Sequence, residues 1–242
     1  LKILYPKVSA YPPDKILNRP LWFFKELAHR IKQSSKLKKD EGLILQREII
    51  STIPTLELFL KLPYIFDVDD AIFLHKKGLA ANLIAKNAEH IICGNSFLAN
   101  YFETYNKNIS IIPTGIDTDL YKPVNHSKRK KVICWSGTSG NFNFLYKIEN
   151  QIKSVLDVSK DWKLRIISNQ KPNFKVIDRE KIDFIYWSPV NEITPIAESS
   201  IGIMPLPDND WSKGKCSLKM LQYMACGLPV VVSNVGMNIE VL

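Results

Sequence analysis

The sequence predicts an α/β protein made of two Rossmann-like lobes with parallel sheets. Short apolar runs rich in Ile and Val recur along its 242 residues without alternating with polar residues. Such runs are typical of strands that are buried on both faces. Helical stretches separate them, and this alternation of strands and helices indicates parallel sheets. A polar segment divides the runs into two series, which predicts two lobes.

Each predicted element follows from this pattern. The expected strands are Leu43–Gln46, Tyr64–Val68, His90–Cys93 and Ser110–Ile112, then Val132–Trp135, Leu164–Ser168, Phe184–Trp187, Ile201–Met204 and Pro229–Val232. The expected helices are Leu21–Lys39, Leu79–Glu89, Phe97–Tyr105, Phe144–Val158 and Ser217–Ala225. Two lobes of this kind form a ligand cleft between them, at the carboxyl ends of their strands.

The dividing segment is polar and basic and contains Pro123, so we interpret it as a linker. The expected organisation is a first domain at 1–122, a linker at 123–131 and a second domain at 132–242. The chain begins with Leu1 rather than Met and stops inside a periodic segment. We therefore expect both lobes to be truncated.

Charge is unevenly distributed. The net charge is +9, and residues 1–130 carry 20 Lys/Arg against 13 Asp/Glu, a net of +7. A basic first half indicates either an anionic partner or simple solubility. The four cysteines form no C-x-x-C pair, which argues against a zinc site and favours buried thiols in a reducing compartment such as the cytoplasm. The four histidines show no metal-ligand spacing.

The segment Ile201–Val232 is the richest in candidate binding residues. A strand leads into a loop, and a helix then begins near Ser217, a suitable N-cap, and ends before Gly227. Lys215 and Lys219 flank the helix start. Free N–H groups at a helix N-terminus, together with cations, suit an anion. The alternative is an ordinary exposed amphipathic helix.

The faces of this helix predict which residues pack and which bind. Leu218, Leu221 and Ala225 share one face at helical spacing, so we expect that face to pack on the sheet. Lys219 and Gln222 lie three residues apart on a different face.

Several segments resemble the family-4 retaining glycosyltransferases of the GT-B fold. Ser217–Val232 (SLKMLQYMACGLPVVV) is similar to that family's donor-binding segment. Phe66–Phe73 (FDVDDAIF) and Ile91–Leu98 (IICGNSFL) resemble elements of the acceptor domain. Ile112–Tyr121 (IPTGIDTDLY) resembles the element before the interdomain linker, and Trp135–Asn141 (WSGTSGN) resembles the glycine loop that opens the donor domain.

The resemblance implies a glycosyltransferase that moves a sugar from a nucleotide-diphosphate sugar to a carbohydrate or lipid-linked acceptor, without a metal or other cofactor. It implies that the protein binds no nucleic acid, and that it works in the cytoplasm, at the inner membrane face for lipid-linked acceptors. The donor-binding residues it implies are Gly137, Thr138, Gly140, Asn141, Lys215, Ser217, Lys219 and Gln222. Lys219 would also stabilise the departing diphosphate.

The sequence departs from the family pattern at one place. Relatives carry two glutamates eight residues apart, the first at the donor sugar and the second at the ribose. This chain has Gly214 and Gln222 at those positions. A glutamine still hydrogen-bonds hydroxyls, so ribose binding is expected to survive, but the sugar contact is lost or moves to Asp208, Asp210 or Trp211.

Asp67-Val68-Asp69-Asp70 also carries a functional signal. An Asp-x-Asp is the metal signature of a different glycosyltransferase fold, but the surrounding pattern argues against that interpretation. Asp69 and Asp70 are instead catalytic candidates that orient the acceptor or steady positive charge on the sugar. The alternative is a helix N-cap. Arg47 and Glu48 are expected to form a surface ion pair.

The predicted helix Leu21–Lys39 is aromatic and basic. Trp22, Phe23, Leu27 and Ile31 either lie on a bilayer, with lysines toward anionic headgroups, or pack on the first sheet.

Three other functions remain as alternatives to glycosyl transfer. They are a nucleotide-sugar epimerase of the same fold, a basic nucleic-acid-binding module and a dehydrogenase, although no G-x-G-x-x-G fingerprint supports the last.

Overall fold

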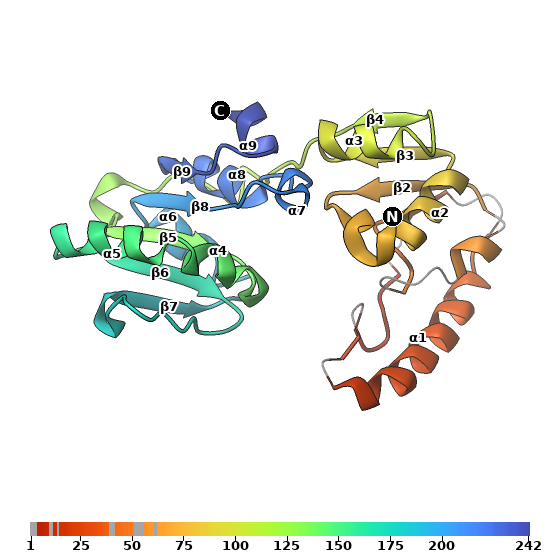
Figure 1. Cartoon of the computed structure of the whole chain (residues 1–242), viewed down its shortest axis with the longest axis horizontal. Helices are drawn as coiled ribbons and strands as arrows, with labels where there is room; N and C mark the ends of the chain where they lie inside the picture. The colour runs from red at the N-terminus through yellow and green to blue at the C-terminus, as the bar shows by residue number, and fades with distance from the viewer. Residues whose placement is uncertain (1–3, 10–11, 14, 39–41, 51–55, 61) are drawn as a thin grey trace. The chain divides into compact units, whose positions relative to one another are not determined.

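The computed structural model describes residues 4–9, 12–13, 15–38, 42–50, 56–60 and 62–242. The chain divides into two compact units, Leu1–Pro113 and Thr114–Leu242 (Figure 1). This division precedes the predicted linker 123–131, whose residues belong to the second unit. Among the described helices, none is long and apolar enough to cross a membrane.

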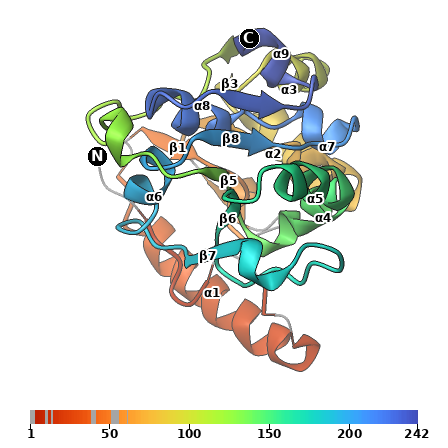
Figure 2. The ribbon, with the colours of Figure 1, turned by 90° about the vertical axis from the view of Figure 1, so that its left-hand side faces the viewer.

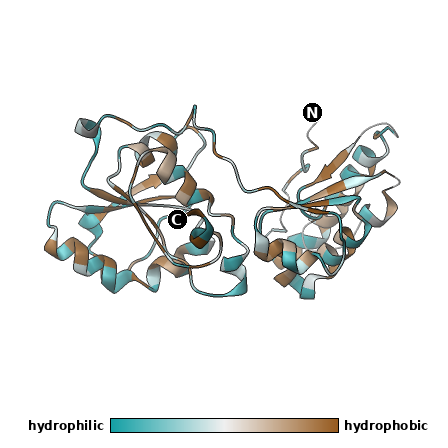
Figure 3. Ribbon diagram, turned by 90° about the horizontal axis from the view of Figure 1, so that it is seen from above, coloured by the Kyte–Doolittle hydropathy of each residue, from teal (hydrophilic) through white to brown (hydrophobic). Residues whose placement is uncertain are grey.

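Both sheets are parallel, as the sequence predicts. The strands of the first are β1 Leu43–Leu45, β2 Tyr64–Val68, β3 His90–Cys93 and β4 Ile109–Ile111. Those of the second are β5 Val132–Ser136, β6 Lys163–Ser168, β7 Ile182–Tyr186, β8 Ile201–Met204 and β9 Val230–Val232. Figure 3 colours much of the strands in both sheets as hydrophobic. The strands were predicted from this apolar composition.

The helices connect and cover these strands. They are α1 Arg19–Ser34, α2 Leu79–Asn87, α3 Ser96–Phe102, α4 Phe142–Tyr146, α5 Glu149–Val158, α6 Ile193–Ala197, α7 Asp210–Lys213, α8 Leu218–Ala225 and α9 Met237–Val241. The predicted helix Phe144–Val158 is two helices, α4 and α5. Lys39, the last residue of the first predicted helix, lies outside the described residues.

The first unit has its strands in sequence order, β1-β2-β3-β4. Phe66 on β2 pairs in register with Ile91 on β3, and both side chains are fully buried. Phe66 also packs edge-on against Phe102 of α3, with ring centroids 5.8 Å apart. The strands therefore form the middle of this unit's core.

The second sheet has the order β7-β6-β5-β8-β9. The chain runs outward from β5 to β7 and then returns to the other side of β5 with β8. In open α/β sheets the point where the order reverses leaves a crevice at the carboxyl ends of the strands, and ligands bind there. In the second unit this point lies between β5 and β8.

Helices cover both faces of the second sheet (Figure 2). Ile133 and Trp135 of β5 point to one face and pack with residues of α4 and α5. Cys134, between them, points to the other face and packs with Tyr223 of α8 and Ile196 of α6. Alternate residues of β5 therefore enter two separate cores, as expected for a strand buried on both sides.

The inward face of α8 differs from the predicted one. Leu218 is 41% exposed, whereas Met220 and Tyr223 are fully buried. Tyr223 fits against Gly202 of β8, where an added Cβ atom would lie only 2.4 Å from its ring. Because Gly202 has no side chain, the Tyr223 ring can pack directly against β8.

The C-terminus of α8 ends as predicted. Gly227 adopts φ +69°, Gly227 N–H donates to Met224 O at 2.8 Å, and Leu228 N–H donates to Tyr223 O at 3.0 Å. These two bonds form a Schellman cap. Arg129 Nη2 donates to Gly227 O at 2.7 Å, which ties part of the predicted linker to this helix end.

The buried side of α1 contacts the segment before it. Trp22 is 7% exposed and its Nε1–H donates to Ser9 O at 3.0 Å. Glu26 is also buried and accepts the backbone N–H of Lys7 at 3.0 Å and of Val8 at 2.5 Å. Trp22 is therefore unavailable to a bilayer, contrary to one of the two sequence-based alternatives.

Candidate functional site

The candidate site lies where β5 ends. Ser136 is the last residue of β5 and is buried, and it lies on the same face of the sheet as Cys134. Its backbone N–H donates to the hydroxyl of Tyr223 at 2.8 Å. This bond links the carboxyl end of β5 directly to α8, so the two elements that border the crevice are held together.

A buried carboxylate is the centre of the site. Glu192 stands at the N-cap position of α6 and is 5% exposed. Lys219 Nζ donates to Glu192 Oε1 at 2.5 Å, and Ser136 Oγ donates to the same oxygen at 2.8 Å. Glu192 thereby joins β5, α6 and α8 at the switch point of the sheet.

Burial and the neighbouring side chains shift the pKa of the Glu192 carboxyl in opposite directions. Burial alone raises its pKa, because the charged form loses water. The nearby Lys219 charge and the hydrogen bonds from Lys219, Ser136 and Trp187 outweigh burial and hold the pKa of Glu192 below its ordinary value. The Glu192 carboxyl is therefore ionised near neutral pH.

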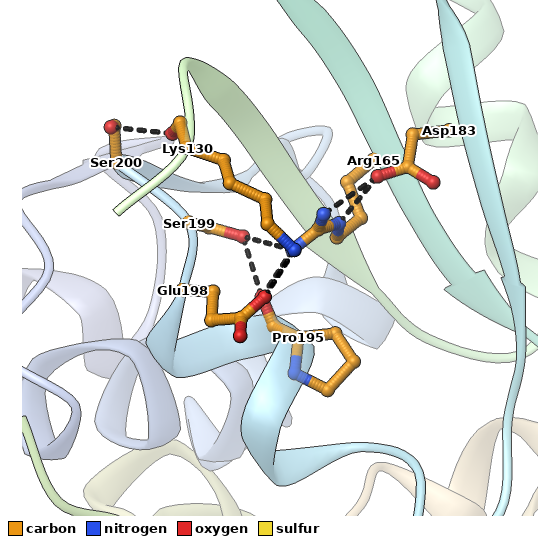
Figure 4. Close-up of polar contacts among 7 residues, drawn as sticks. All are labelled: Lys130, Arg165, Asp183, Pro195, Glu198, Ser199 and Ser200. Atoms are coloured by element: carbon orange, nitrogen blue, oxygen red, sulfur yellow. Dashed lines mark hydrogen bonds and ion pairs between the residues drawn. The ribbon is translucent and has the colours of Figure 1, made fainter. Parts of the chain in front are cut away.

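A second buried ionic cluster holds α6 in place (Figure 4). Arg165 of β6 is 4% exposed and forms an ion pair with Asp183 of β7 at 2.7 Å. Its Nη1 also donates to Pro195 O, inside α6, at 2.8 Å. Just beyond the helix, Lys130 Nζ bonds Glu198 at 2.5 Å. Since α6 is fixed at this end, Glu192 at its other end has a defined position.

Tyr121 and Gln222 extend the site away from Lys219. Gln222 Nε2 donates to the Tyr121 hydroxyl at 2.6 Å, and that hydroxyl donates to Glu192 Oε2 at 3.3 Å. Burial, followed by the nearby charge of Glu192, raises the pKa of Tyr121 to about 12, so it keeps its proton. Gln222 is 4% exposed, and its Oε1 is buried without a hydrogen-bond partner.

Three residues of the predicted α8 segment have different surroundings in the structure. Lys219 and Gln222 belong to one network around Glu192. Ser217 occupies the N-cap position as predicted, with φ +54°, but its side chain does not cap the helix. Its Oγ bonds Asn238 Oδ1 at 2.7 Å instead.

The predicted glycine loop follows Ser136 directly. Gly137 is required by space, because an added Cβ atom would lie 2.8 Å from the Trp135 ring, whereas Gly140 has open surroundings. Thr138 and Asn141 bond each other through Oγ1 and Nδ2 at 3.2 Å. The loop is therefore adjacent to the network, at the end of the same strand.

Lys215 contacts an aromatic ring. Its Nζ stands 5.0 Å from the centroid of the Trp211 ring, a cation–π geometry. Asp208, one alternative for the missing sugar contact, forms an ion pair with Lys213 at 3.3 Å.

In the first unit, the acidic run follows β2. Asp70 Oδ2 lies 2.6 Å from Arg47 Nη2, so Arg47 pairs with Asp70 and not with Glu48 as expected. Gln46 Nε2 donates to Asp67 Oδ2 at 3.2 Å. Ala71, rather than Asp69 or Asp70, precedes the 3₁₀ turn Ile72–Gly78. Across the described residues, no three His, Cys, Asp or Glu side chains gather closely enough to hold a metal ion.

Two comparisons with known proteins give results. Residues 130–242 match the family described as "Glycosyl transferases group 1". The match begins just before β5 and includes the five strands of the second sheet, α8 and Glu192 with Ser136, Lys219 and Gln222, whereas Tyr121 lies before it. It supports a glycosyl-transfer role for this part of the chain. No curated protein matches the sequence.

Solved structures share the fold at low sequence identity. The catalytic domain of starch synthase IV from Arabidopsis thaliana, solved bound to ADP and acarbose, superposes with a TM-score of 0.64 at 11% identity, over 96% of this chain and 64% of that one. WaaG, a glycosyltransferase involved in lipopolysaccharide biosynthesis, gives 0.61 at 11%, over 97% and 71%. TarM of S. aureus, in a complex containing UDP, gives 0.59 at 13%, over 88% and 46%.

These similarities define the architecture as the GT-B class that the sequence predicts. The chain spans about two thirds of the starch synthase domain and less than half of TarM. Glu192, Ser136 and Tyr121 are the site residues that sequence reasoning missed. Glu192 gives no local signal of its role, because its partner Lys219 lies 27 residues away in the sequence.

Proposed function

We propose that the protein transfers a sugar from a nucleotide-diphosphate sugar to a carbohydrate or lipid-linked acceptor, with retention of anomeric configuration. The observation that carries the proposal is the buried, unpartnered Oε1 of Gln222, beside the Lys219 ammonium at the switch point of the second sheet. A buried acceptor without a partner is unfavourable by about 1–3 kcal/mol, so the site is suited to a ligand hydroxyl.

The roles follow from the contacts. A lysine ammonium has three N–H donors, and Glu192 takes one, so Lys219 retains others for a diphosphate. The N–H groups at the start of α8, which the Ser217 side chain does not cap, and the loop with Gly137, Thr138, Gly140 and Asn141 supply further positive dipole. Lys215 adds charge before the helix. Gln222 accepts a ribose hydroxyl.

The chemical step needs no separate cofactor in this proposal. As the glycosidic bond breaks, negative charge develops on the leaving diphosphate, and Lys219 stabilises it. The departing phosphate takes the acceptor proton, so the new bond forms on the face that it leaves. Asp69 and Asp70 are proposed to orient the acceptor or to steady positive charge on the sugar.

Kinetics of two variants test the site. Lys219→Ala should lower kcat about 100-fold, because its contact strengthens in the transition state. Gln222→Ala should raise KM more than it lowers kcat, because the ribose does not change during the reaction. Lys153→Ala is the matched control, since it removes only an exposed pair with Asp157. Wild-type kinetics for both site variants would remove the site from α8.

Four further measurements separate the alternatives. A thermal-shift screen with UDP, GDP, ADP and their sugars identifies the donor. Product analysis without an acceptor distinguishes transfer from epimerisation, and the anomeric configuration of the product tests retention. Activity should persist in excess EDTA, because lysines and N–H groups meet the diphosphate charge. Loss in EDTA and recovery with manganese would favour a metal at Asp67 and Asp69.

We also propose that the protein works in the cytoplasm and contacts a membrane through α1, by a face that shares only Ile31 with the predicted one. Leu21, Phe24 and Ile31 are exposed on α1, beside the exposed Lys25 and Lys32. Apolar side chains flanked by lysines suit an anionic bilayer surface. The protein should co-sediment with anionic vesicles and not with neutral ones, and Phe24→Ser should reduce that binding.

A further inference from the structure

Three side chains of the second unit form one directed chain of hydrogen bonds. Gln222 Nε2 bonds the Tyr121 hydroxyl at 2.6 Å, and the hydroxyl bonds Glu192 Oε2 at 3.3 Å. The other carboxylate oxygen of Glu192 is occupied by Lys219 and Ser136. The chain ends at Gln222 Oε1, which is buried and has no partner.

The carboxylate fixes the direction of the whole chain. An ionised carboxylate can only accept hydrogen bonds, so Tyr121 must use its single proton toward Glu192. The Tyr121 oxygen can then only accept from Gln222. The amide of Gln222 must therefore turn its NH₂ toward Tyr121, which leaves its oxygen at the far end.

The direction decides what the free end of Gln222 can bind. A glutamine amide that is free to rotate offers either a donor or an acceptor. In this network it offers an acceptor only, and native structures pair nearly all such buried atoms. Oε1 is closed to water here, but its neighbours Tyr121 and Lys219 are themselves only partly buried. A ligand therefore reaches Oε1 when the Lys219 side chain shifts, while the bond between Tyr121 and Gln222 stays in place.

We propose that Glu192, acting through Tyr121, is a positioning residue that makes Gln222 a fixed hydrogen-bond acceptor, so that the site selects ligands whose ribose hydroxyl donates a proton. The inference rests on the proposed function, because it takes the ligand to be a nucleoside diphosphate. It assigns Glu192 and Tyr121 a part in specificity that neither the sequence nor the family match suggests.

Nucleotide analogues test the direction of the bond on the wild-type protein. The probes are UDP, ADP and GDP, and for the one that binds, its forms with hydrogen, fluorine or an amino group at the 2′ or the 3′ carbon. An amino group donates, whereas fluorine and hydrogen do not. At one of the two positions, the hydroxyl and amino forms should bind between about 5-fold and 100-fold more tightly than the fluoro and deoxy forms.

Two variants test whether Glu192 and Tyr121 set this preference. Tyr121→Phe removes the hydroxyl, and Glu192→Gln removes the obligatory acceptor while keeping the shape. Either change frees the Gln222 amide to rotate, so the ratio between amino and fluoro forms should fall toward 1. Tyr146→Phe is the matched control, because its hydroxyl bonds Asn173 N at 3.0 Å in the same unit and its ring packs on the other face of the sheet.

The outcomes are distinct. If the wild-type protein binds the fluoro form as tightly as the hydroxyl form at both positions, the inference is overturned even when nucleotides bind. If the ratio survives unchanged in folded Tyr121→Phe and Glu192→Gln, Gln222 does not depend on them and the inference fails. If none of the three diphosphates binds the wild-type protein, the proposed function fails first, and the inference with it.

Discussion

The two units place an ion pair at comparable points of their sheets, yet the pairs differ in setting. In the first unit, Arg47–Asp70 follows β1 and β2, and its side chains are 28% and 24% exposed. In the second, Lys219–Glu192 has a carboxylate that is only 7% exposed and that accepts from the side chains of Lys219, Ser136, Tyr121 and Trp187. The first sheet keeps its described strands in sequence order, whereas the second reverses at β5 and β8.

The difference shows how topology prepares a site. A reversal of strand order opens a crevice beside the ends of two strands, and the second unit fills it with a charged network. Where the strands run in order, the same kind of acidic run stays near solvent. Solvent-exposed pairs contribute little to stability, whereas a buried charge that loses its partner is strongly unfavourable.

The largest effect should come from breaking each pair by removing its cation. Lys219→Ala should lower the free energy of unfolding of the second unit by roughly 3 kcal/mol, because it leaves the buried Glu192 charge without its counter-ion. Arg47→Ala should cost the first unit less than about 1 kcal/mol. Amide hydrogen exchange in β2 and β5 reports the two units separately. Equal losses of unfolding free energy in the two variants would show that the burial of Glu192 does not make its ion pair more important for stability.

A smaller effect should come from removing one hydroxyl in each unit. Tyr223→Phe leaves the buried Ser136 N–H without its acceptor, so the second unit should lose roughly 2 kcal/mol. Tyr101→Phe removes a partly buried bond to Asn82 and should cost the first unit about 1 kcal/mol or less. Urea unfolding of both variants measures the difference, and the reverse order would contradict the comparison.

The smallest effect concerns pH. Because the folded-state pKa of Glu192 is depressed below its ordinary 4.5, its stabilisation is fully present above that value and is lost as pH falls through the folded pKa. The stability difference between wild type and Glu192→Gln should therefore be largest near about pH 7 and shrink below about pH 4.5. A difference that stays constant down to about pH 3 would show that Glu192 is not ionised in the folded protein.

Much of the fold could be predicted because buried parallel strands have a simple signature. The bounds of β2, β3 and β8 are those that the apolar runs predicted, and Gly227 marked the end of α8. The break between α4 and α5 carries no glycine or proline, so it had no local signal.

The site could be predicted only in part. Lys219 and Gln222 were found because they share a helix, where spacing in sequence gives spacing in space. Glu192 lies 27 residues from Lys219, and only the sheet order brings them together. The packing face of α8 was predicted wrongly because the deciding feature is a missing side chain at Gly202, on another element.

The bonds around Arg129 have a consequence for proteolysis. Residues 122–131 are rich in lysine and arginine and would seem an open target for trypsin. Yet Arg129 is bound to the carbonyl oxygens of Cys226 and Gly227, and Lys130 and Lys131 are paired with Glu198 and Asp161. A protease binds its target segment in an extended conformation. For residues 129–131 this requires breaking the bonds from Arg129 to the end of α8. Trypsin cannot use Lys122, although its side chain is 61% exposed, because Pro123 follows it. Cleavage at Arg129, Lys130 and Lys131 should therefore be slow as long as the second unit stays folded.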